Sequence, residues 1–474
     1  MKNGLAPINK VPPEVLALIP DYWGEWDKDV GVIPLTHVCR AWREIYTSRS
    51  SLWTMFLCAD ADKTRVYLQR SKSSPISLLY SWLSRRNLSS NDPLLQVIPY
   101  ATGRLKYLSV ESMPENVGDI TIHLSSPAPL LEYLSIDCVY GPGAPSDFVL
   151  PPSLFDGNLS SLHTLFLRCV CTNVPWRNMV NLTSFTLCHN RPGEVSIGQL
   201  LDFFESASRL ERVDLVQATP TSGVQPGRLV HLTRLKWMSV ESGEPCSPLF
   251  DHLLIPVGVT LSLQPDSFSP RLESYLPRSL GNFRNLSIIT EISLDPIGYA
   301  NMRFAGPNGE LSAMCREFQD DITPPVLEYL ARIDTSKTER LEIYRGTPTS
   351  RDPPRRTLLS MKSLRTLTLY QCDGLHFFIR ALHPGTSSSE AMVCPKLEEL
   401  ILIPPTDGEV FNIEDLVYMA AARALVGVKL GTVKIICGQD KVDPGGILEL
   451  EKHVLDVECG PGVIDGDSDS GEEG

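Results

Sequence analysis

The side chains best suited to chemistry in this sequence are its cysteines and histidines. Cys169 and Cys171 are separated by a single residue, whereas the ligand pairs of structural zinc sites are usually separated by about two to four. On strand alternation both thiols would lie on one face at the end of a strand, so a core or edge position is the favoured interpretation. The pair therefore predicts no metal site.

Catalytic constellations are equally sparse. None of the nine histidines has a cysteine or carboxylate beside it at catalytic spacing, and the sequence contains no P-loop, no Gly-x-Ser-x-Gly and no His-Glu-x-x-His. We therefore expect no enzymatic activity, no cofactor and no metal. An enzyme whose active site is assembled from distant residues is the least favoured of three alternatives.

Composition sets the class of protein. The chain has 474 residues, of which 42% are apolar and 21% charged, values typical of soluble globular proteins. This length exceeds the roughly 250–300 residues that one core organises, so several domains or an elongated repeat are expected. The net charge of −13 and the pI near 5.3 disfavour nucleic acid and anionic membranes as partners.

The sequence predicts a cytoplasmic or nuclear location. The twelve cysteines are scattered and indicate reduced thiols, and we find neither a signal-peptide pattern nor an apolar run of about 18 residues. Glycosylation is then not expected at the four Asn-x-Ser/Thr sequences, which are better interpreted as parts of a repeat. They begin at Asn87, Asn158, Asn181 and Asn285.

A repeated pattern of apolar residues at positions 1, 4 and 6 dominates the chain. Its first residues are 20 to 31 positions apart in the early copies, close to the period of about 20–29 in leucine-rich repeats. The early copies begin at Leu105, Leu131, Leu162, Leu182, Leu210 and Leu235, clean late copies at Leu364 and Leu397, and weaker copies span 289–294, 341–343 and 455–457.

In each copy a short strand would point positions 4 and 6 inward and positions 3 and 5 outward. The outward positions predict an open sheet face that mixes aromatic and small polar side chains and faces a protein substrate. The candidate residues are Tyr107, Ser109, Tyr133, Ser135, Thr164, Phe166, Arg212, Asp214, Trp237 and Ser239.

Helices are expected between the strands. Residues 197–210 have helical spacing, with Ile197, Leu200, Leu201 and Phe204 on one face. These patterns together predict a right-handed strand-to-helix solenoid with long loops. The least regular stretch, 245–334, is expected to hold an insertion, with 257–263 as a degenerate repeat.

The first 56 residues have a different pattern. Pro12 and Pro13 suit the first turn of a helix, and Pro20 should end it. Pro34 is expected to open a second helix that carries an apolar stripe. Any such helix pair could simply cap a solenoid.

Three marks in this segment resemble an F-box, in the form found at the head of many fungal proteins. They are Val11-Pro-Pro-Glu-Val-Leu, Leu35-Thr-His-Val-Cys-Arg-Ala-Trp-Arg43 and Ser51-Leu-Trp53. The resemblance implies a three-helix domain that docks on the Skp-type adaptor of a cullin-RING ubiquitin ligase. The adaptor-facing residues that it implies are Pro13, Leu16, Pro34, Leu35, Val38 and Cys39, while Trp42, Ile45 and Trp53 would form the core. The family usually continues its first helix where this chain has Pro20.

The fold expected from these patterns is α/β, with a small helical F-box domain followed by an irregular leucine-rich-repeat solenoid built on a curved parallel sheet. The predicted divisions are a tail at 1–8, the F-box at 9–56, a helical linker or cap at 57–100, the solenoid at 101–460 and an acidic, disordered tail at 461–474. The expected function is substrate recognition for the ligase. The alternative is a ligase-independent interaction scaffold with a helical cap.

Overall fold

The computed structural model divides the chain into two compact units, which we describe separately. The first comprises residues 1–226 and 232–235, and the second 227–231 and 236–474. The structure describes residues 7–22, 28–58, 60–81, 92–138, 149–151, 153–172, 179–188, 195–218, 220, 227–265, 275–278, 280–295, 300–315, 323–384, 391–405, 411–437 and 442–460. The predicted tail 461–474 and residues 1–6 lie outside these ranges.

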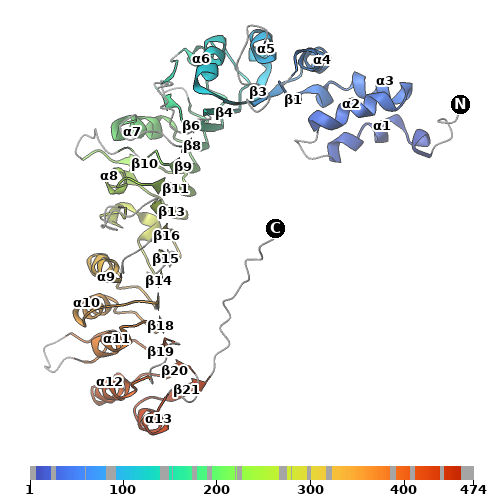
Figure 1. The fold of residues 1–474 in the computed structure, drawn as a ribbon. Coiled ribbons are helices and arrows are strands. Elements are labelled where there is room, and N and C mark those ends of the chain that lie inside the picture. The colour runs from blue at the N-terminus through green and yellow to red at the C-terminus, as the bar shows by residue number, and fades with distance from the viewer. Residues whose placement is uncertain are drawn as a thin grey trace. The chain divides into compact units, whose positions relative to one another are not determined.

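Short helices open the first unit (Figure 1). Pro13 stands at the first position of α1, and Pro20 lies in the 3₁₀ turn that replaces any continuation of this helix, as predicted. Pro34, by contrast, lies inside α2 rather than at its start. The helix is interrupted at Cys39, whose extended backbone (φ −159°, ψ 175°) separates α2 from the next helix. The elements are η2 (Pro7–Lys10), α1 (Pro13–Leu16), η3 (Ile19–Tyr22), α2 (Lys28–Val38), α3 (Arg40–Ser48) and η5 (Ser50–Trp53).

Seven strands of the first unit pair in chain order, and every pair is parallel. They are β1 (Met55–Leu57), β2 (Ile76–Ser81), β3 (Leu105–Ser112), β4 (Tyr133–Cys138), β6 (Thr164–Arg168), β8 (Ser184–Cys188) and β9 (Arg212–Val216). The predicted helical linker 57–100 is therefore wrong in part. It contains two helices, but β2 lies within it and pairs with β1 and β3, so the sheet begins at Met55.

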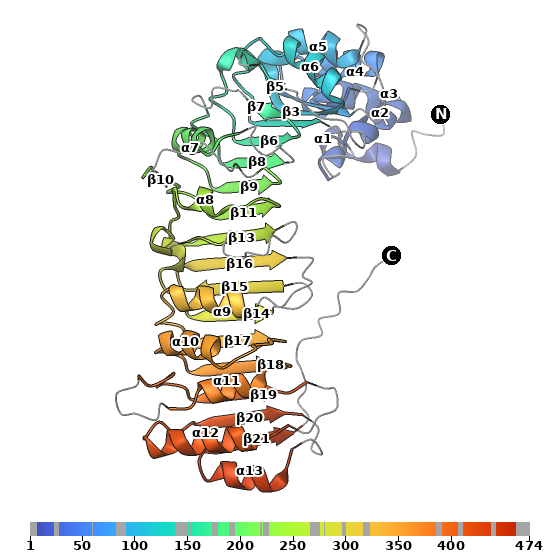
Figure 2. The ribbon, with the colours of Figure 1, turned by 60° about the vertical axis from the view of Figure 1, so that its left-hand side comes forward.

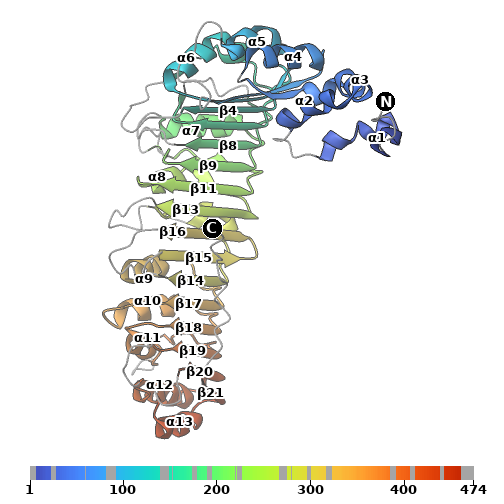
Figure 3. The same ribbon diagram turned by 45° about the vertical axis from the view of Figure 1, so that its right-hand side comes forward.

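Helices of the first unit lie on one side of these strands (Figure 3). They are α4 (Ala61–Ser71), α5 (Pro93–Ala101), α6 (Pro114–His123) and α7 (Ile197–Ser206), with η7 (Thr102–Arg104) and η8 (Leu154–Gly157) between elements. The predicted apolar stripe of α7 is buried. A small separate pairing joins β5 (Val149–Leu150) to β7 (Cys171–Thr172).

The second unit has ten strands of a mostly parallel sheet. These are β11 (Trp237–Ser242), β13 (Val259–Pro265), β14 (Glu291–Asp295), β15 (Ala300–Gly306), β16 (Gly309–Cys315), β17 (Arg340–Tyr344), β18 (Thr366–Tyr370), β19 (Glu399–Ile403), β20 (Thr432–Ile436) and β21 (Asp456–Gly460). Their order from β17 to β21 follows the chain and is parallel throughout.

An insertion interrupts this order, as the sequence predicted for 245–334. β13 pairs with β16, and β14 pairs with β17, so the three inserted strands lie in reverse chain order. β15 is antiparallel to both of its neighbours. The β15–β16 hairpin needs glycine where it turns, because Gly309 has φ 138° and a Cβ there would lie 2.5 Å from the Val259 carbonyl oxygen.

Helices cover one face of the second unit's strands (Figure 2) and leave the opposite face open (Figure 1). They are α8 (Ser247–Phe250), α9 (Thr323–Arg332), α10 (Asp352–Ser360), α11 (Leu375–Ala381), α12 (Glu414–Leu425) and α13 (Pro444–Glu451), with η11 (Leu280–Asn282), η12 (Arg284–Leu286) and the β10–β12 pair (Val230–His231, Leu253–Leu254) beside them. The core consists of inward strand positions such as Leu367, Leu400 and Val433, each fully buried. This stacking confirms the predicted leucine-rich-repeat-like fold.

Candidate interaction surfaces

The cysteines do not form a reactive or metal-binding centre in the described residues. Cys169 follows β6 in the left-handed region (φ 53°), so the alternation predicted for the Cys169-x-Cys171 pair ends there, and the Cys171 side chain lies outside the described part. Burial raises the pKa of Cys246, Cys372 and Cys394 to about 12, which keeps these thiols protonated at neutral pH. No group of three or more His, Cys, Asp or Glu side chains in this part could hold a metal ion.

The N-terminal helices are joined by a small aromatic core. The Tyr46 hydroxyl donates to the Leu16 carbonyl oxygen at 2.6 Å, and the Trp53 indole N–H donates to the Tyr46 carbonyl oxygen at 2.8 Å. Trp42 meets the Tyr46 ring edge to face at 5.7 Å. Trp42, Tyr46 and Trp53 are all buried, whereas Ile45, also expected in this core, is only partly covered.

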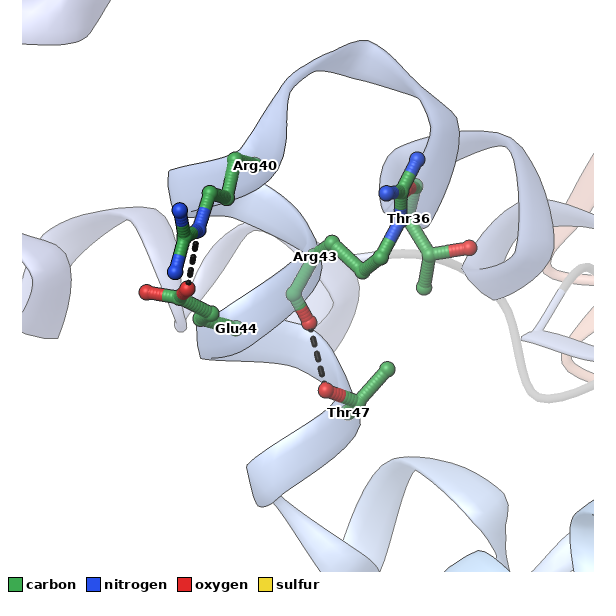
Figure 4. Close-up of polar contacts among 5 residues, drawn as sticks. All are labelled: Thr36, Arg40, Arg43, Glu44 and Thr47. Atoms are coloured by element: carbon green, nitrogen blue, oxygen red, sulfur yellow. Dashed lines mark hydrogen bonds and ion pairs between the residues drawn. The ribbon is translucent and has the colours of Figure 1, made fainter.

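Polar contacts fix the junction of α2 and α3 (Figure 4). The Arg43 Nε donates to the Thr36 carbonyl oxygen at 2.9 Å, so a side chain of α3 satisfies a backbone acceptor near the end of α2. Arg40 pairs with Glu44 at 2.9 Å on the exposed side of α3, and the Thr47 hydroxyl donates to the Arg43 carbonyl oxygen at 2.6 Å. The helix break at Cys39 is thus a defined turn.

The predicted adaptor-facing residues divide between surface and core. Pro13 and Pro34 are exposed, and Val38 is 49% exposed. Leu35 and Cys39 are partly covered. Leu16 is 4% exposed, which removes it from the surface and places it in the core. Leu16 is buried where its carbonyl oxygen accepts the hydrogen bond from Tyr46, which holds α1 against α3.

Two surface residues of α1 and its following turn were missed. Val15 is 51% exposed and Leu18 45% exposed, and their three-residue spacing puts them on one side of a helical turn. We define the apolar N-terminal surface as Pro13, Val15, Leu18, Pro34 and Val38. The spacing of Val15 and Leu18 was visible in the sequence, but it could not show which side of so short a helix faces the core.

On the first unit, the register aligns the predicted outward residues across β3, β4 and β6. Tyr107, Tyr133 and Thr164 form one row. The Tyr107 and Tyr133 rings stack at 4.1 Å with planes 5° apart. A second row, two residues further along each strand, consists of Ser109, Ser135 and Phe166.

Two predicted outward residues of this unit are nearly covered. Ser135 is 7% exposed between Ser109 and Phe166 of the neighbouring strands. Asp214 is 9% exposed beneath the Arg212 guanidinium, whose Nε lies 2.7 Å from its carboxylate. They support the face rather than present a contact. The other candidates on these strands, and Trp237 and Ser239 on the second unit, are at least partly exposed.

The next outward positions of β4 and β6 carry charged side chains that the repeat pattern did not predict. Arg168 lies over the Phe166 ring at 5.4 Å and pairs with Asp137 at 3.1 Å on the neighbouring strand. Arg168 and Asp137 lie at position 7, two residues after the last outward position of the repeat pattern. The alternation of the strand would have located them if the pattern had been extended.

The open face of the second unit carries more negative than positive charge. The open positions of β14 to β21, together with the end of β17, carry seven carboxylates and four cationic side chains. The carboxylates are Glu291, Asp295, Glu310, Glu342, Glu399, Asp456 and Glu458, and the cations are Arg303, Arg340, Arg345 and Lys434. Three cations already contact carboxylates, since Arg303 pairs with Glu310, Arg345 with Asp295 and Lys434 with Glu399.

The fold and these open faces define a leucine-rich-repeat-like solenoid, a class of scaffold that binds other molecules over extended sheet surfaces. No known family profile matches the chain, and no curated protein sequence matches it. A crystal structure of a TLR13–ssRNA13 complex is similar over 76% of this chain, at 16% sequence identity and a TM-score of 0.30. The match covers 49% of that chain, so this protein spans about half its length. None of the helices in the described residues is long and apolar enough to cross a membrane.

Proposed function

We propose that this protein is the substrate receptor of a cullin-RING ubiquitin ligase, an F-box protein of the fungal type that acts in the cytoplasm or nucleus. Its N-terminal helices would dock on the Skp-type adaptor, and its open sheet faces would hold a protein substrate. The observation that carries the proposal is the apolar N-terminal surface. Pro13, Val15, Leu18, Pro34 and Val38 remain exposed on a three-helix unit whose motifs resemble an F-box.

The proposed mechanism is proximity. A receptor of this kind would hold a client near a ubiquitin-charged enzyme elsewhere on the ligase, which raises effective concentration without a nucleophile or base of its own.

Binding of the full chain to a purified Skp-type adaptor tests the docking. Val38→Asp and Val15→Asp place a charge in the centre of an apolar contact, and each should weaken adaptor binding at least about tenfold. Both side chains are half exposed, so neither substitution disturbs the core. Ile122→Asp, at a side chain of α6 that is 69% exposed, is the matched control and should leave binding unchanged. Absence of wild-type binding, or equal binding by all four chains, contradicts the proposal.

The second candidate is a ligase-independent scaffold in which the same helices only cap the solenoid. Trp53 favours it, because its ring is fully buried, lies 5.0 Å from the Tyr67 ring of α4 and is covered by the Arg70 guanidinium at 4.2 Å. The N-terminal unit is thus joined to the first repeat.

Deletion of residues 1–48 separates the two functions. This boundary keeps Trp53 and β1, which a cut after residue 56 would remove. A pure cap predicts that the shortened chain aggregates or loses cooperative unfolding. A docking module predicts a soluble, folded repeat domain without adaptor binding.

A further inference from the structure

One part of the second unit's open face is apolar rather than polar. Tyr344, Tyr370 and Ile403 occupy one line across β17, β18 and β19. Ile401 lies two residues before Ile403 on the same face, and Ile436 lies at the end of the neighbouring strand β20. All five side chains are partly exposed. We call these five residues the β17–β20 patch.

The patch is not required by the fold. Inward positions of the same strands, such as Leu369 and Leu402, are fully buried and form the core. The outward positions of β3, β4 and β6 carry Ser, Thr and charged side chains beside their aromatic residues. Partly exposed isoleucine and tyrosine side chains that adjoin across strands about 4.8 Å apart form a contiguous apolar area, which is the composition of an interface centre.

Carboxylates border the patch. Glu342 lies beside Tyr344 and accepts a hydrogen bond from its hydroxyl at 3.2 Å. Glu399 is two residues before Ile401, and Glu458 lies across from Lys434. The Lys434 ammonium lies 3.1 Å from Glu399 and 3.7 Å from Glu458, so two carboxylates share one cation. Glu399 and Glu458 raise the pKa of Lys434. Glu310 likewise raises the pKa of the Arg303 guanidinium.

We propose that the β17–β20 patch binds an extended, cationic segment of a partner protein, in which lysine or arginine residues flank an aliphatic or aromatic side chain. The apolar side chain would cover Ile401 and Ile403, and the cations would meet Glu342, Glu399 and Glu458. This proposal rests on the proposed receptor role and specifies the chemistry of its substrate.

Charge decides between this occupant and two others. A nucleic acid would bring phosphates to a face that already has surplus negative charge. A second copy would bring a chain of net charge −13 to the same face. Both are opposed by long-range repulsion, whereas a cationic segment is attracted to the face before contact is made.

Selection from a random 12-residue peptide library displayed on phage, with the full chain as bait, tests the proposal without assuming a sequence. The full chain carrying Ile401→Ser and Tyr370→Ser is the counter-selection bait. We expect enriched peptides of net positive charge that contain an aliphatic or aromatic residue and are lost on the counter-selection bait. No enrichment, enrichment of neutral or acidic peptides, or equal enrichment on both baits would overturn the proposal.

The most enriched peptide, synthesised with a fluorophore, is then titrated with the full chain. Glu342→Gln should weaken peptide binding several-fold and Ile401→Ser about tenfold. Raising the salt concentration from 50 to 200 mM should weaken peptide binding by the wild-type chain. Glu451→Gln, an exposed helical carboxylate in α13, is the charge-matched control and should change nothing. Equal affinities for Glu342→Gln and wild type contradict the proposal.

Adaptor binding is measured on the same chains. It should depend on Val38 and be insensitive to Ile401→Ser. Peptide binding without adaptor binding would leave the patch in place and refute only the ligase role. Adaptor binding without peptide selection would refute only the patch.

Discussion

The Tyr46 hydroxyl lies 2.6 Å from the carbonyl oxygen of Leu16 and donates a buried hydrogen bond to it across 30 residues of sequence. The acceptor belongs to α1, a helix of four residues that is too short to be stable alone. This bond and the one that the Arg49 side chain donates to the Ala17 carbonyl oxygen therefore orient Val15 and Leu18. A side chain absent from the predicted core thus orients the apolar N-terminal surface.

Tyr46→Phe should loosen α1 while leaving the repeats unaffected. Removal of the hydroxyl leaves the Leu16 carbonyl unsatisfied, which costs about 1–3 kcal/mol. Hydrogen exchange of residues 13–22 should accelerate accordingly, and adaptor binding should weaken in parallel. Tyr100→Phe, at a ring that is 85% exposed, is the control. Unchanged exchange in Tyr46→Phe would show that α1 is held by apolar packing and by the hydrogen bond from Arg49 to the Ala17 carbonyl oxygen.

Arg423 is predicted to be irreplaceable by lysine. It is fully buried, and its guanidinium donates to the carbonyl oxygens of Val393 and Cys394, both at 2.9 Å, and to that of Leu382 at 3.4 Å. A single ammonium group cannot reproduce this planar fork. Arg423→Lys should lower the free energy of unfolding by about 2–4 kcal/mol in urea titration.

The control for this substitution is Arg380→Lys. Arg380 is exposed on the neighbouring helix α11 and pairs with Asp415 at 3.0 Å, so the change should cost less than about 1 kcal/mol. Similar losses in the two variants would mean that the three carbonyl groups find other donors.

The repeat pattern predicted strands well because their inward positions must be filled by branched apolar side chains. Every copy noted in the sequence coincides with a strand. β20 was missed although Leu430-Gly-Thr-Val-Lys-Ile435 has the same apolar positions, with valine at the fourth. β2 was missed because its alternation of Ile76, Leu78 and Tyr80 lacks the leucine signature.

The reversed order of β14, β15 and β16 could not be predicted from the same signal. Alternation shows which side chains of a strand face inward, but it does not identify the neighbouring strand. The candidate surfaces show the same limit. Leu16 was expected on the adaptor-facing surface and Ser135 at an outward strand position, yet tertiary neighbours bury both. The β17–β20 patch was likewise missed, because only the register brings Tyr344, Tyr370 and Ile403 into one line.

The start of α7 should be sensitive to a single hydroxyl. Ser196 accepts a hydrogen bond from the Gln199 backbone N–H at 3.2 Å, and the Gln199 side chain accepts one from the Ser196 N–H at 2.9 Å. Ser196→Ala removes half of this capping box and should cost about 1 kcal/mol, seen as faster hydrogen exchange in 197–206. Ser196→Asp keeps an acceptor and should restore protection. Slow exchange in both variants would assign the stability of α7 to its buried apolar face.

Stability should fall as the solution becomes mildly alkaline. The thiols of Cys246, Cys372 and Cys394 have a pKa of about 12 in the folded protein because burial disfavours the thiolate. In the unfolded chain their pKa is about 8.5. A folded pKa above the unfolded one stabilises the fold fully below about pH 8.5, and this contribution is lost as the pH rises toward 12. Each thiol can contribute a slope of up to about 1.4 kcal/mol per pH unit.

Urea titrations between pH 7.5 and 9.5 measure this effect below the range in which tyrosine side chains titrate, at about pH 10 and above. Burial also raises the pKa of the Cys188 thiol to about 11, so a smaller decline should remain when the three cysteines are replaced. Replacement of the three cysteines by alanine should lower stability at pH 7.5, since each removes buried sulfur, but should flatten its decline with pH. General destabilisation would lower the free energy of unfolding by a similar amount at every pH. Loss of the three thiols should instead narrow the stability difference from wild type as the pH rises. An equally steep decline in the triple variant would mean that other groups control the alkaline transition and that the thiols reach solvent in the folded protein.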